Sequence, residues 1–331
     1  MSKSAPLYML ADIGGTHARI AAYDGNKMTP ARIYKTSEYE AATELFARFR
    51  DDENLPKDNL NVAIAAAGRM DKDNIWRIGN NKDWAINVSA FEESRFPIVH
   101  ICGDFEATAY GVAHMHRGDT IVLKEGDTKD FYKPRVVCGP GTGLGLAYAI
   151  PGKAETRIQH TYGGHFPASP QTEEQTLVMR LVKQLGQHEY TVSFEDIVSG
   201  RGLPVLHRAV CLMHGLPEKH DTSQGFILEN KDDVSVQETL RLFFEFFGLF
   251  LQTAVITGDA YGGVYLDGGL IQFLVEKNLI DTSSMLHFMS HNSFPVIRDY
   301  LEATPVAVID TPFIALQGLK SIVDEGKHKD V

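Results

Sequence analysis

Cysteine is scarce in this chain of 331 residues, which contains three cysteines at wide spacing. Cys102, Cys138 and Cys211 form neither a disulfide framework nor a zinc-binding spacing. We therefore expect reduced thiols and a cytoplasmic protein. The segment after Met1 also lacks an apolar signal core, so we do not expect secretion.

Positive charge is in deficit. The chain has 32 Lys and Arg against 43 Asp and Glu, a formal net charge of -11. This balance disfavours nonspecific binding to nucleic acid or to an anionic membrane. Any phosphate group must therefore be bound by donors that the fold gathers locally.

The chain also lacks a clear membrane-spanning run. Its most apolar segment, residues 240–256, contains Arg241, Glu245 and Gln252 and is shorter than the roughly 20 residues that a bilayer requires. We predict a buried core helix there. The length of the chain exceeds what one core usually serves, so we expect two domains with the ligand site in the cleft between them.

Glycine-rich loops are the most informative feature that is present. One covers residues 12–19 and a second covers residues 139–145, and each is flanked by two strand-like segments. A strand–turn–strand loop differs from Rossmann and Walker loops, which lead from a strand into a helix. Glycine permits positive φ and leaves N–H groups open to an anionic oxygen, and Thr16 and Thr142 add hydroxyl donors. An ordinary hairpin turn is the alternative for either loop alone.

Other segments indicate an α/β protein. Residues 62–67 and 98–102 are continuous apolar runs that predict buried strands. Ser37 and Glu40 form a capping-box pattern that predicts the start of a helix. A third glycine pair, Gly268-Gly269, follows a strand-like segment and precedes a helical one, an arrangement that suits a nucleoside.

Together these loops resemble those of the hexokinase, actin and Hsp70 ATPase superfamily. Gly163-Gly164-His165 and residues 197–203 make the chain more similar to the bacterial glucokinase family, over nearly its whole length. The resemblance implies an α/β, two-domain actin-like ATPase (ribonuclease H-like) fold with a ligand cleft. It implies a small α/β domain of residues 1–113 and about 306–331, and a larger α+β domain of residues 114–305.

The resemblance also implies ATP-dependent phosphorylation of the 6-hydroxyl of a hexose, with glucose the first choice, by a homodimer that uses Mg²⁺. Asp104, after the predicted strand at 98–102, is implied as the catalytic base, and Asp12 as the residue that holds Mg²⁺ through water. A helix cap and a turn cap are the alternatives for these two aspartates. The implied cofactor-binding residues are Asp12, Gly14, Gly15, Thr16, Gly139, Gly141, Thr142, Gly143, Gly268 and Gly269.

The sugar site departs from the family pattern at two positions. The implied substrate-binding residues are Gly103, Tyr162, His165, Glu195 and Asn81. Relatives usually carry asparagine at the position of Gly103 and glutamate at that of Tyr162. A site that hydrogen-bonds the hydroxyl groups of its substrate distinguishes substrates by about 10⁴ to 10⁵ in kcat/KM when one hydrogen-bond partner is missing.

Three functions therefore stay open. The first is a glucokinase, and the second is a kinase of another or substituted hexose. The third is a catalytically weak sugar- or nucleotide-binding sensor. His165 and Glu195 also have plainer interpretations, as a structural histidine and a solvated helix residue.

Overall fold

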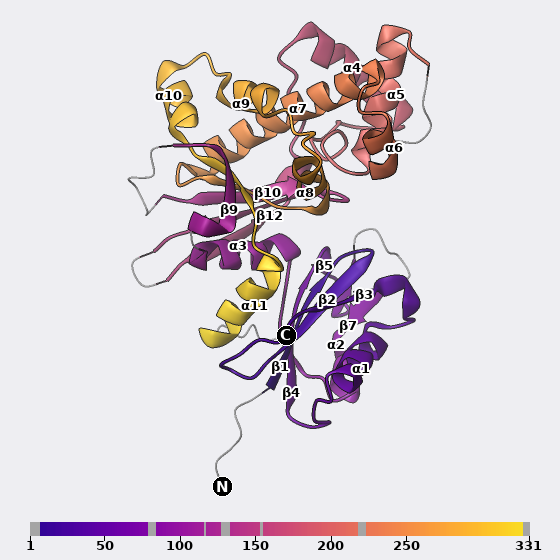
Figure 1. Ribbon diagram of the computed structural model, residues 1–331, viewed down its shortest axis with the longest axis vertical. Coiled ribbons are helices and arrows are strands. Elements are labelled where there is room, and N and C mark those ends of the chain that lie inside the picture. Colours follow the sequence, from indigo (N-terminus) through magenta and orange to yellow (C-terminus); the bar gives the residue numbers. More distant parts are fainter. Residues whose placement is uncertain are drawn as a thin grey trace. The chain divides into compact units, whose positions relative to one another are not determined.

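The computed structural model describes residues 7–78, 84–115, 117–126, 133–152, 155–217 and 223–326. The chain forms two compact units (Figure 1). Unit 1 consists of Met1–Arg117 and Thr311–Val331, and unit 2 of Gly118–Asp310.

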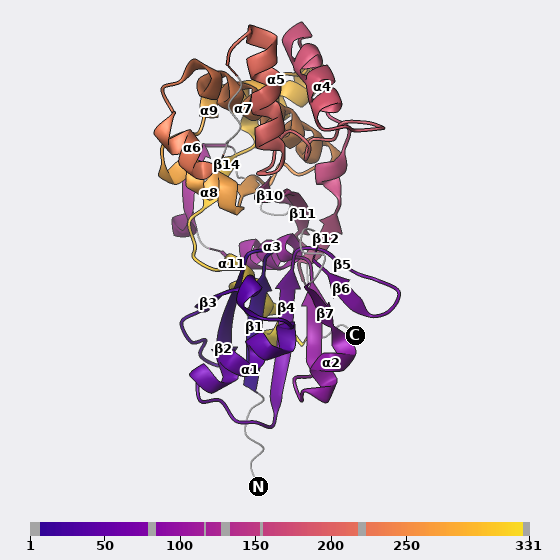
Figure 2. The ribbon, with the colours of Figure 1, turned by 90° about the vertical axis from the view of Figure 1, so that its right-hand side faces the viewer.

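Unit 1 is built on a five-stranded sheet in the order β3-β2-β1-β4-β8. Strand β1 pairs antiparallel with β2 and parallel with β4, and β4 pairs parallel with β8. Figure 2 shows β3, β2, β1 and β4 in this order. The strands are β1 (Leu7–Ile13), β2 (His17–Tyr23), β3 (Arg32–Lys35), β4 (Leu60–Ala66) and β8 (Ile98–Cys102). A smaller sheet contains β5 (Arg69–Met70), β6 (Ile75–Arg77) and β7 (Ala85–Asn87).

Helices supply the two apolar cores of unit 1. Phe46 and Phe49 of α1 (Ala42–Asp52) and Phe91 of α2 (Val88–Glu93) form one core with residues of the main sheet. Helices α3 (Asp104–His114) and α11 (Ile314–Asp324) form the other with alternate residues of β1, β2 and β4. The continuous apolar character of β4 and β8 follows from burial, as predicted.

The predicted helix start at Ser37 is wrong. A short 3₁₀ helix, η1 (Thr36–Glu38), stands there, and α1 begins at Ala42 without a side-chain cap. Thr36 donates its hydroxyl to the carbonyl of Gly15 and its N–H to the carbonyl of Thr16. These bonds to a distant loop fix the backbone at Thr36, so the tertiary contact overrides the local capping signal.

Helices α3 and α11 touch backbone to backbone. A Cβ placed on Gly318 would lie 1.8 Å from the carbonyl oxygen of Ala107, and one on Gly111 would lie 2.6 Å from that of Ile314. No side chain fits at either position without separating the helices. Glycine at these two positions therefore allows α11 to pack directly against α3 in unit 1.

The variant Gly318→Ala is expected to destabilise unit 1 by about 1–3 kcal/mol, the usual cost of overpacking. Both tryptophans of the chain, Trp76 and Trp84, lie in unit 1, so tryptophan fluorescence during urea unfolding reports on this unit. Gln317→Ala changes the adjacent, exposed position of α11 and should leave the midpoint nearly unchanged. Equal midpoints for the two variants would contradict this account of the helix contact.

Unit 2 is built on a six-stranded sheet in the order β12-β11-β10-β13-β14-β9. Its strands are β9 (Thr120–Lys124), β10 (Arg135–Pro140), β11 (Leu144–Ile150), β12 (Arg157–Thr161), β13 (Val264–Leu266) and β14 (Val306–Ile309). Strand β14 pairs with β13 and β9. The segment that returns to unit 1 therefore starts at Thr311, a few residues after the boundary near residue 306 expected from sequence.

The longest helix of unit 2 is the apolar α7 (Val234–Gly258), which packs against α9 (Thr282–Ser290) and α5 (Gly202–His214) (Figure 1). By length and composition α7 is able to cross a membrane, but 78% of its most apolar 18-residue window is buried within the protein. The segment is thus the buried core helix that the sequence predicted. The other helices are α4 (Glu173–Leu185), α6 (Gln224–Glu229), α8 (Gly269–Glu276) and α10 (Pro295–Ala303).

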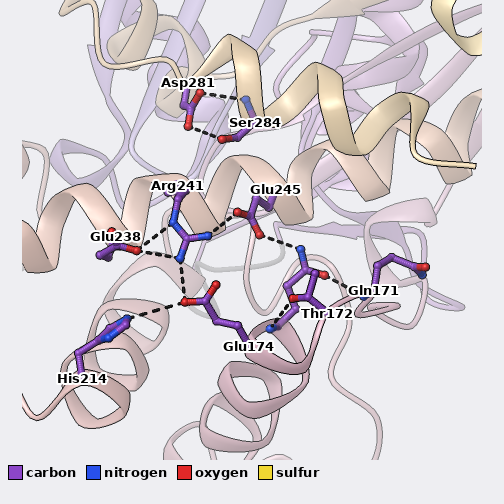
Figure 3. A network of polar contacts seen from close by, with 10 residues as sticks. Gln171, Thr172, Glu174, His214, Glu238, Arg241, Glu245, Asp281 and Ser284 are labelled. Carbon is purple, nitrogen blue, oxygen red and sulfur yellow. Dashed lines mark hydrogen bonds and ion pairs between the residues drawn. The ribbon is translucent and has the colours of Figure 1, made fainter.

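An ion-pair network centred on Arg241 joins α7 to α4 (Figure 3). The Arg241 guanidinium bonds Glu174 at 2.8 Å, Glu238 at 2.7 Å and the buried Glu245 at 2.5 Å. Glu174, His214 and Glu238 also hold their ligand atoms within 4.8 Å of one another. Because the Arg241 guanidinium already bonds the carboxylates of Glu174 and Glu238, we interpret this group as a structural network rather than a metal site.

Candidate active site

The first glycine loop is the turn of the β1–β2 hairpin, as predicted. Gly14 donates its N–H to the carbonyl of His17 at 2.9 Å. Neither Gly14 nor Gly15 adopts positive φ, so the turn does not use the conformational freedom that glycine permits. Gly15 is exposed, and no atom lies within 4 Å of a Cβ built there, so the loop is open on this side.

Asp12 and Asp104 lie at the same end of the unit 1 sheet, where the parallel strands β1, β4 and β8 have their carboxyl ends. Asp12 lies opposite Ala65 of β4, which in turn lies opposite Cys102 of β8. Asp104 begins α3 just beyond the end of β8. Since neighbouring strands are about 4.8 Å apart, the ends of β1 and β8 are separated by about 10 Å. Both carboxylates therefore lie at the carboxyl ends of parallel strands, Asp12 within β1 and Asp104 just after β8, where ligands of α/β sheets bind.

The surroundings of the two aspartates differ. Asp12 pairs with Arg19 at 3.0 Å, and its side chain is 15% exposed. Asp104 is the first residue of α3, and its Oδ1 accepts the N–H of Phe105 at 2.9 Å. Gly103, which is buried, occupies the N-cap position, so the alternative interpretation of Asp104 as the cap is wrong.

The second glycine loop is the turn of the β10–β11 hairpin, also as predicted. Gly139 pairs with Gly145, and Gly141 donates its N–H to the carbonyl of Gly143 at 2.9 Å. A Cβ on Gly139 would lie 1.9 Å from the carbonyl oxygen of Asp267. The second loop is therefore in backbone contact with the end of β13.

That contact brings the third glycine pair beside the second loop. Gly268 has φ of 117°, and a Cβ there would lie 2.7 Å from the carbonyl oxygen of Pro140. The conformation favours glycine, and the close approach excludes a side chain. Gly269, the next residue, begins α8. The N-terminus of α8 thus lies next to the second loop, and helix N-termini favour anionic groups.

The Gly-Gly-His segment and Glu195 lie on the other side of the second loop. A Cβ on Gly164 would lie 2.1 Å from the carbonyl oxygen of Leu144. Glu195 donates its N–H to the carbonyl of Gly164 at 2.9 Å, and its Oε2 accepts the N–H of Leu144 at 2.8 Å. Glu195 is outside any helix and its side chain is 15% exposed, so its interpretation as a solvated helix residue is wrong.

The remaining predicted sugar residues of unit 2 are accessible. His165 is exposed, and Tyr162 is 59% exposed with its ring edge-on to His160 at 5.0 Å. Tyr162 and His165 flank the Gly163-Gly164 pair, which approaches Leu144 and Leu146 of β11. Asn81 lies outside the described residues.

Sequence reasoning missed one residue of this cluster, Arg201. Its guanidinium bonds Glu195 Oε1 at 2.5 Å and the carbonyl of Thr142 at 3.4 Å. The resemblance rests in part on residues 197–203, which include Arg201, but it assigns this arginine no role. An arginine beside two glycines in a chain with a deficit of cations was the signal available.

The two glycine hairpins, with Asp12 and Asp104 at the carboxyl ends of β1 and β8, are typical of the actin-like ATPase fold. Solved structures agree on the fold. The glucokinase from an Antarctic psychrotroph has a TM-score of 0.77 at 21% identity, with 97% of this chain and 99% of that chain covered. The glucokinase from Balamuthia mandrillaris in complex with glucose has a TM-score of 0.76 at 21% identity, with 97% and 94% covered.

Sequence comparison gives the family. The family model described as Glucokinase matches residues 9–326. A glucokinase of Saccharophagus degradans is 31% identical, with 96% of this chain and 98% of that protein covered. The bifunctional protein glk of Burkholderia orbicola is 28% identical over 96% of this chain, which spans about half (48%) of that relative's length. The chain belongs to the glucokinase family, and its predicted fold is confirmed.

The variant Gly139→Ala is expected to separate β10 from the end of β13, because the new Cβ has no room. Amide exchange in peptides covering residues 134–140 and 264–268 should rise by about tenfold or more. Gly141→Ala is the matched control, since its Cβ would lie 3.8 Å from the nearest atom. Unchanged exchange in Gly139→Ala would show that this backbone contact does not hold the two loops together.

Proposed function

We propose that the protein transfers the terminal phosphoryl group of ATP to the 6-hydroxyl of a hexose, with glucose as the first candidate. The observation that carries the proposal is the position of Asp104, on the same sheet edge as Asp12 and the first glycine loop. Family membership supports the same reaction.

In this mechanism Asp104 accepts the proton of the attacking sugar hydroxyl. Its Oδ1 accepts the N–H of Phe105 at the start of α3, which orients the carboxylate. The glycine loops supply backbone N–H donors and the hydroxyls of Thr16 and Thr142 to the phosphates. Phosphoryl transfer depends mainly on such positioning and on neutralisation of charge.

Asp12 is the residue that we propose for Mg²⁺. Its Oδ2 pairs with Arg19 at 3.0 Å, and the residue lies at the carboxyl end of β1, directly before the first glycine loop. A single carboxylate suits Mg²⁺, which keeps several waters and takes further oxygen ligands from phosphates. When bound, the metal would offset charge on the transferred group.

The variant Asp104→Asn should lower kcat by about 10² to 10⁴, the usual contribution of a positioned base. Binding of a non-hydrolysable ATP analogue should change little, because the variant keeps both glycine loops. Glu93→Gln, at an exposed position on α2 of the same unit, is the control and should retain full activity. Steady-state ADP release measures kcat, and an undiminished value in Asp104→Asn would remove this residue from the mechanism.

A second candidate is a kinase of another or substituted hexose. Tyr162 is exposed and stands where relatives usually carry a carboxylate. It presents an aromatic ring to the sugar instead of a charged group that binds a sugar hydroxyl. Gly103 likewise offers no side chain beside Asp104. Its φ of -66° and ψ of 149° suit any residue, and asparagine is a favourable N-cap, so the backbone itself does not demand glycine.

The double variant Gly103→Asn/Tyr162→Glu is therefore expected to shift specificity towards glucose, by restoring an amide and a carboxylate. The measurement is the ratio of kcat/KM for glucose to that for N-acetylglucosamine or an anhydrosugar. Each residue at most adds one hydroxyl partner, so we expect a shift of about tenfold or more. A ratio equal to that of the wild type would exclude these positions as specificity determinants.

We further propose that the protein is a homodimer of the cytoplasm, on the basis of the family resemblance. The burial of Cys102, Cys138 and Cys211 supports reduced thiols, since burial raises the pKa of the Cys138 thiol and suppresses the reactive thiolate. Sedimentation velocity of the purified protein tests the assembly, and a single monomeric species would contradict it.

A further inference from the structure

The segment from Glu195 to Gly202 wraps around the second glycine loop. Gly200 donates its N–H to the carbonyl of Gly141 at 2.8 Å, and Glu195 Oε2 accepts the N–H of Leu144. Ser199 donates its hydroxyl to the carbonyl of Glu195 and accepts the N–H of Gly202, so it links the two ends of this segment. The position of the second loop therefore depends on this segment.

Within this wrap, Glu195 poses an electrostatic problem for the proposed function. Its carboxylate is directly bonded to the loop that is proposed to hold phosphates, and the Glu195 side chain is only 15% exposed. A partly buried negative charge at that place repels a polyphosphate, because solvent screens it poorly. The chain as a whole carries an excess of 11 negative charges and adds to the repulsion.

Arg201 lies next to Glu195 and offsets its negative charge. Its Nη2 bonds Glu195 Oε1 at 2.5 Å, while its Nε donates to the carbonyl of Thr142 at 3.4 Å. One guanidinium thus holds both the acidic residue and the loop, a geometry that arginine achieves and lysine does not. The Arg201 side chain is 53% exposed, so the positive charge stays at the surface of the loop.

We propose that Arg201 is a positioning residue for the nucleotide: it holds the Thr142–Leu144 turn and cancels the charge of Glu195 beside the phosphates. The inference rests on the proposed binding of ATP at the second loop. It does not depend on which sugar is phosphorylated. Its test is therefore a binding measurement made without sugar.

The experiment is calorimetric titration of the full chain with Mg²⁺ and a non-hydrolysable ATP analogue. Arg201→Met should weaken binding by about tenfold or more, since it leaves one partner of a close charge pair alone. Raising the salt concentration should recover part of the loss by screening. Arg180→Met, at an exposed position on α4, is the control and should bind as the wild type does.

A double variant distinguishes the effect of the Glu195 charge on nucleotide binding from a loss of local structure. Arg201→Met/Glu195→Gln keeps an oxygen that can accept the N–H of Leu144 but removes the negative charge. We expect it to bind within about threefold of the wild type, since no uncompensated charge remains. Wild-type affinity in Arg201→Met, or no rescue in the double variant, would overturn the proposal.

Folding and the broader function are checked separately. If Arg201→Met does not fold, judged by near-ultraviolet circular dichroism, Arg201→Lys replaces it. Lysine keeps the positive charge but not the two-sided contact of the guanidinium, so Arg201→Lys should bind more weakly than the wild type, by about threefold. A loss as large as tenfold in Arg201→Lys would overturn the charge role. Absence of analogue binding by the wild type would instead refute the proposed function, and the inference with it.

Discussion

The site in unit 2 depends on a backbone contact that admits no side chain. Strand β10 meets the end of β13 through Gly139, whose Cβ would fall 1.9 Å from the carbonyl oxygen of Asp267. The same approach places Gly268 against Pro140 and sets the start of α8 beside the second loop. The glycines thus act mainly by being small, and only Gly268 among the site glycines described here clearly needs a left-handed conformation.

Charge is the second constraint on the site. A chain with 43 acidic and 32 basic side chains repels polyphosphates at long range. Backbone N–H groups of the glycine loops and helix N-termini offset this repulsion, because they carry partial positive charge without adding side chains. Glu195 and Arg201 form a neutral pair within the same structure, so the acidic residue can order the loop without opposing the ligand.

The sequence predicted those parts of the site that depend on local pattern. The two hairpin loops, the buried strands and the core helix follow from glycine, apolar runs and length, and the structure has them all. The helix start at Ser37 was wrong because Thr36 is bound to a loop distant in sequence. Arg201 was missed for the same reason, since its partners Thr142 and Glu195 become neighbours only after folding. The shared edge of Asp12 and Asp104 likewise depends on strand order, which periodicity does not reveal.

The most direct test of the account is ADP formation from Mg-ATP by the purified chain across a panel of hexoses. The panel should include glucose, mannose, fructose, N-acetylglucosamine, glucosamine and an anhydrosugar. The account predicts that at least one hexose strongly stimulates ADP formation and is converted to its phosphate ester, with glucose the first candidate. Nucleotide binding without turnover on any sugar, or ATP hydrolysis indifferent to sugar, would contradict it.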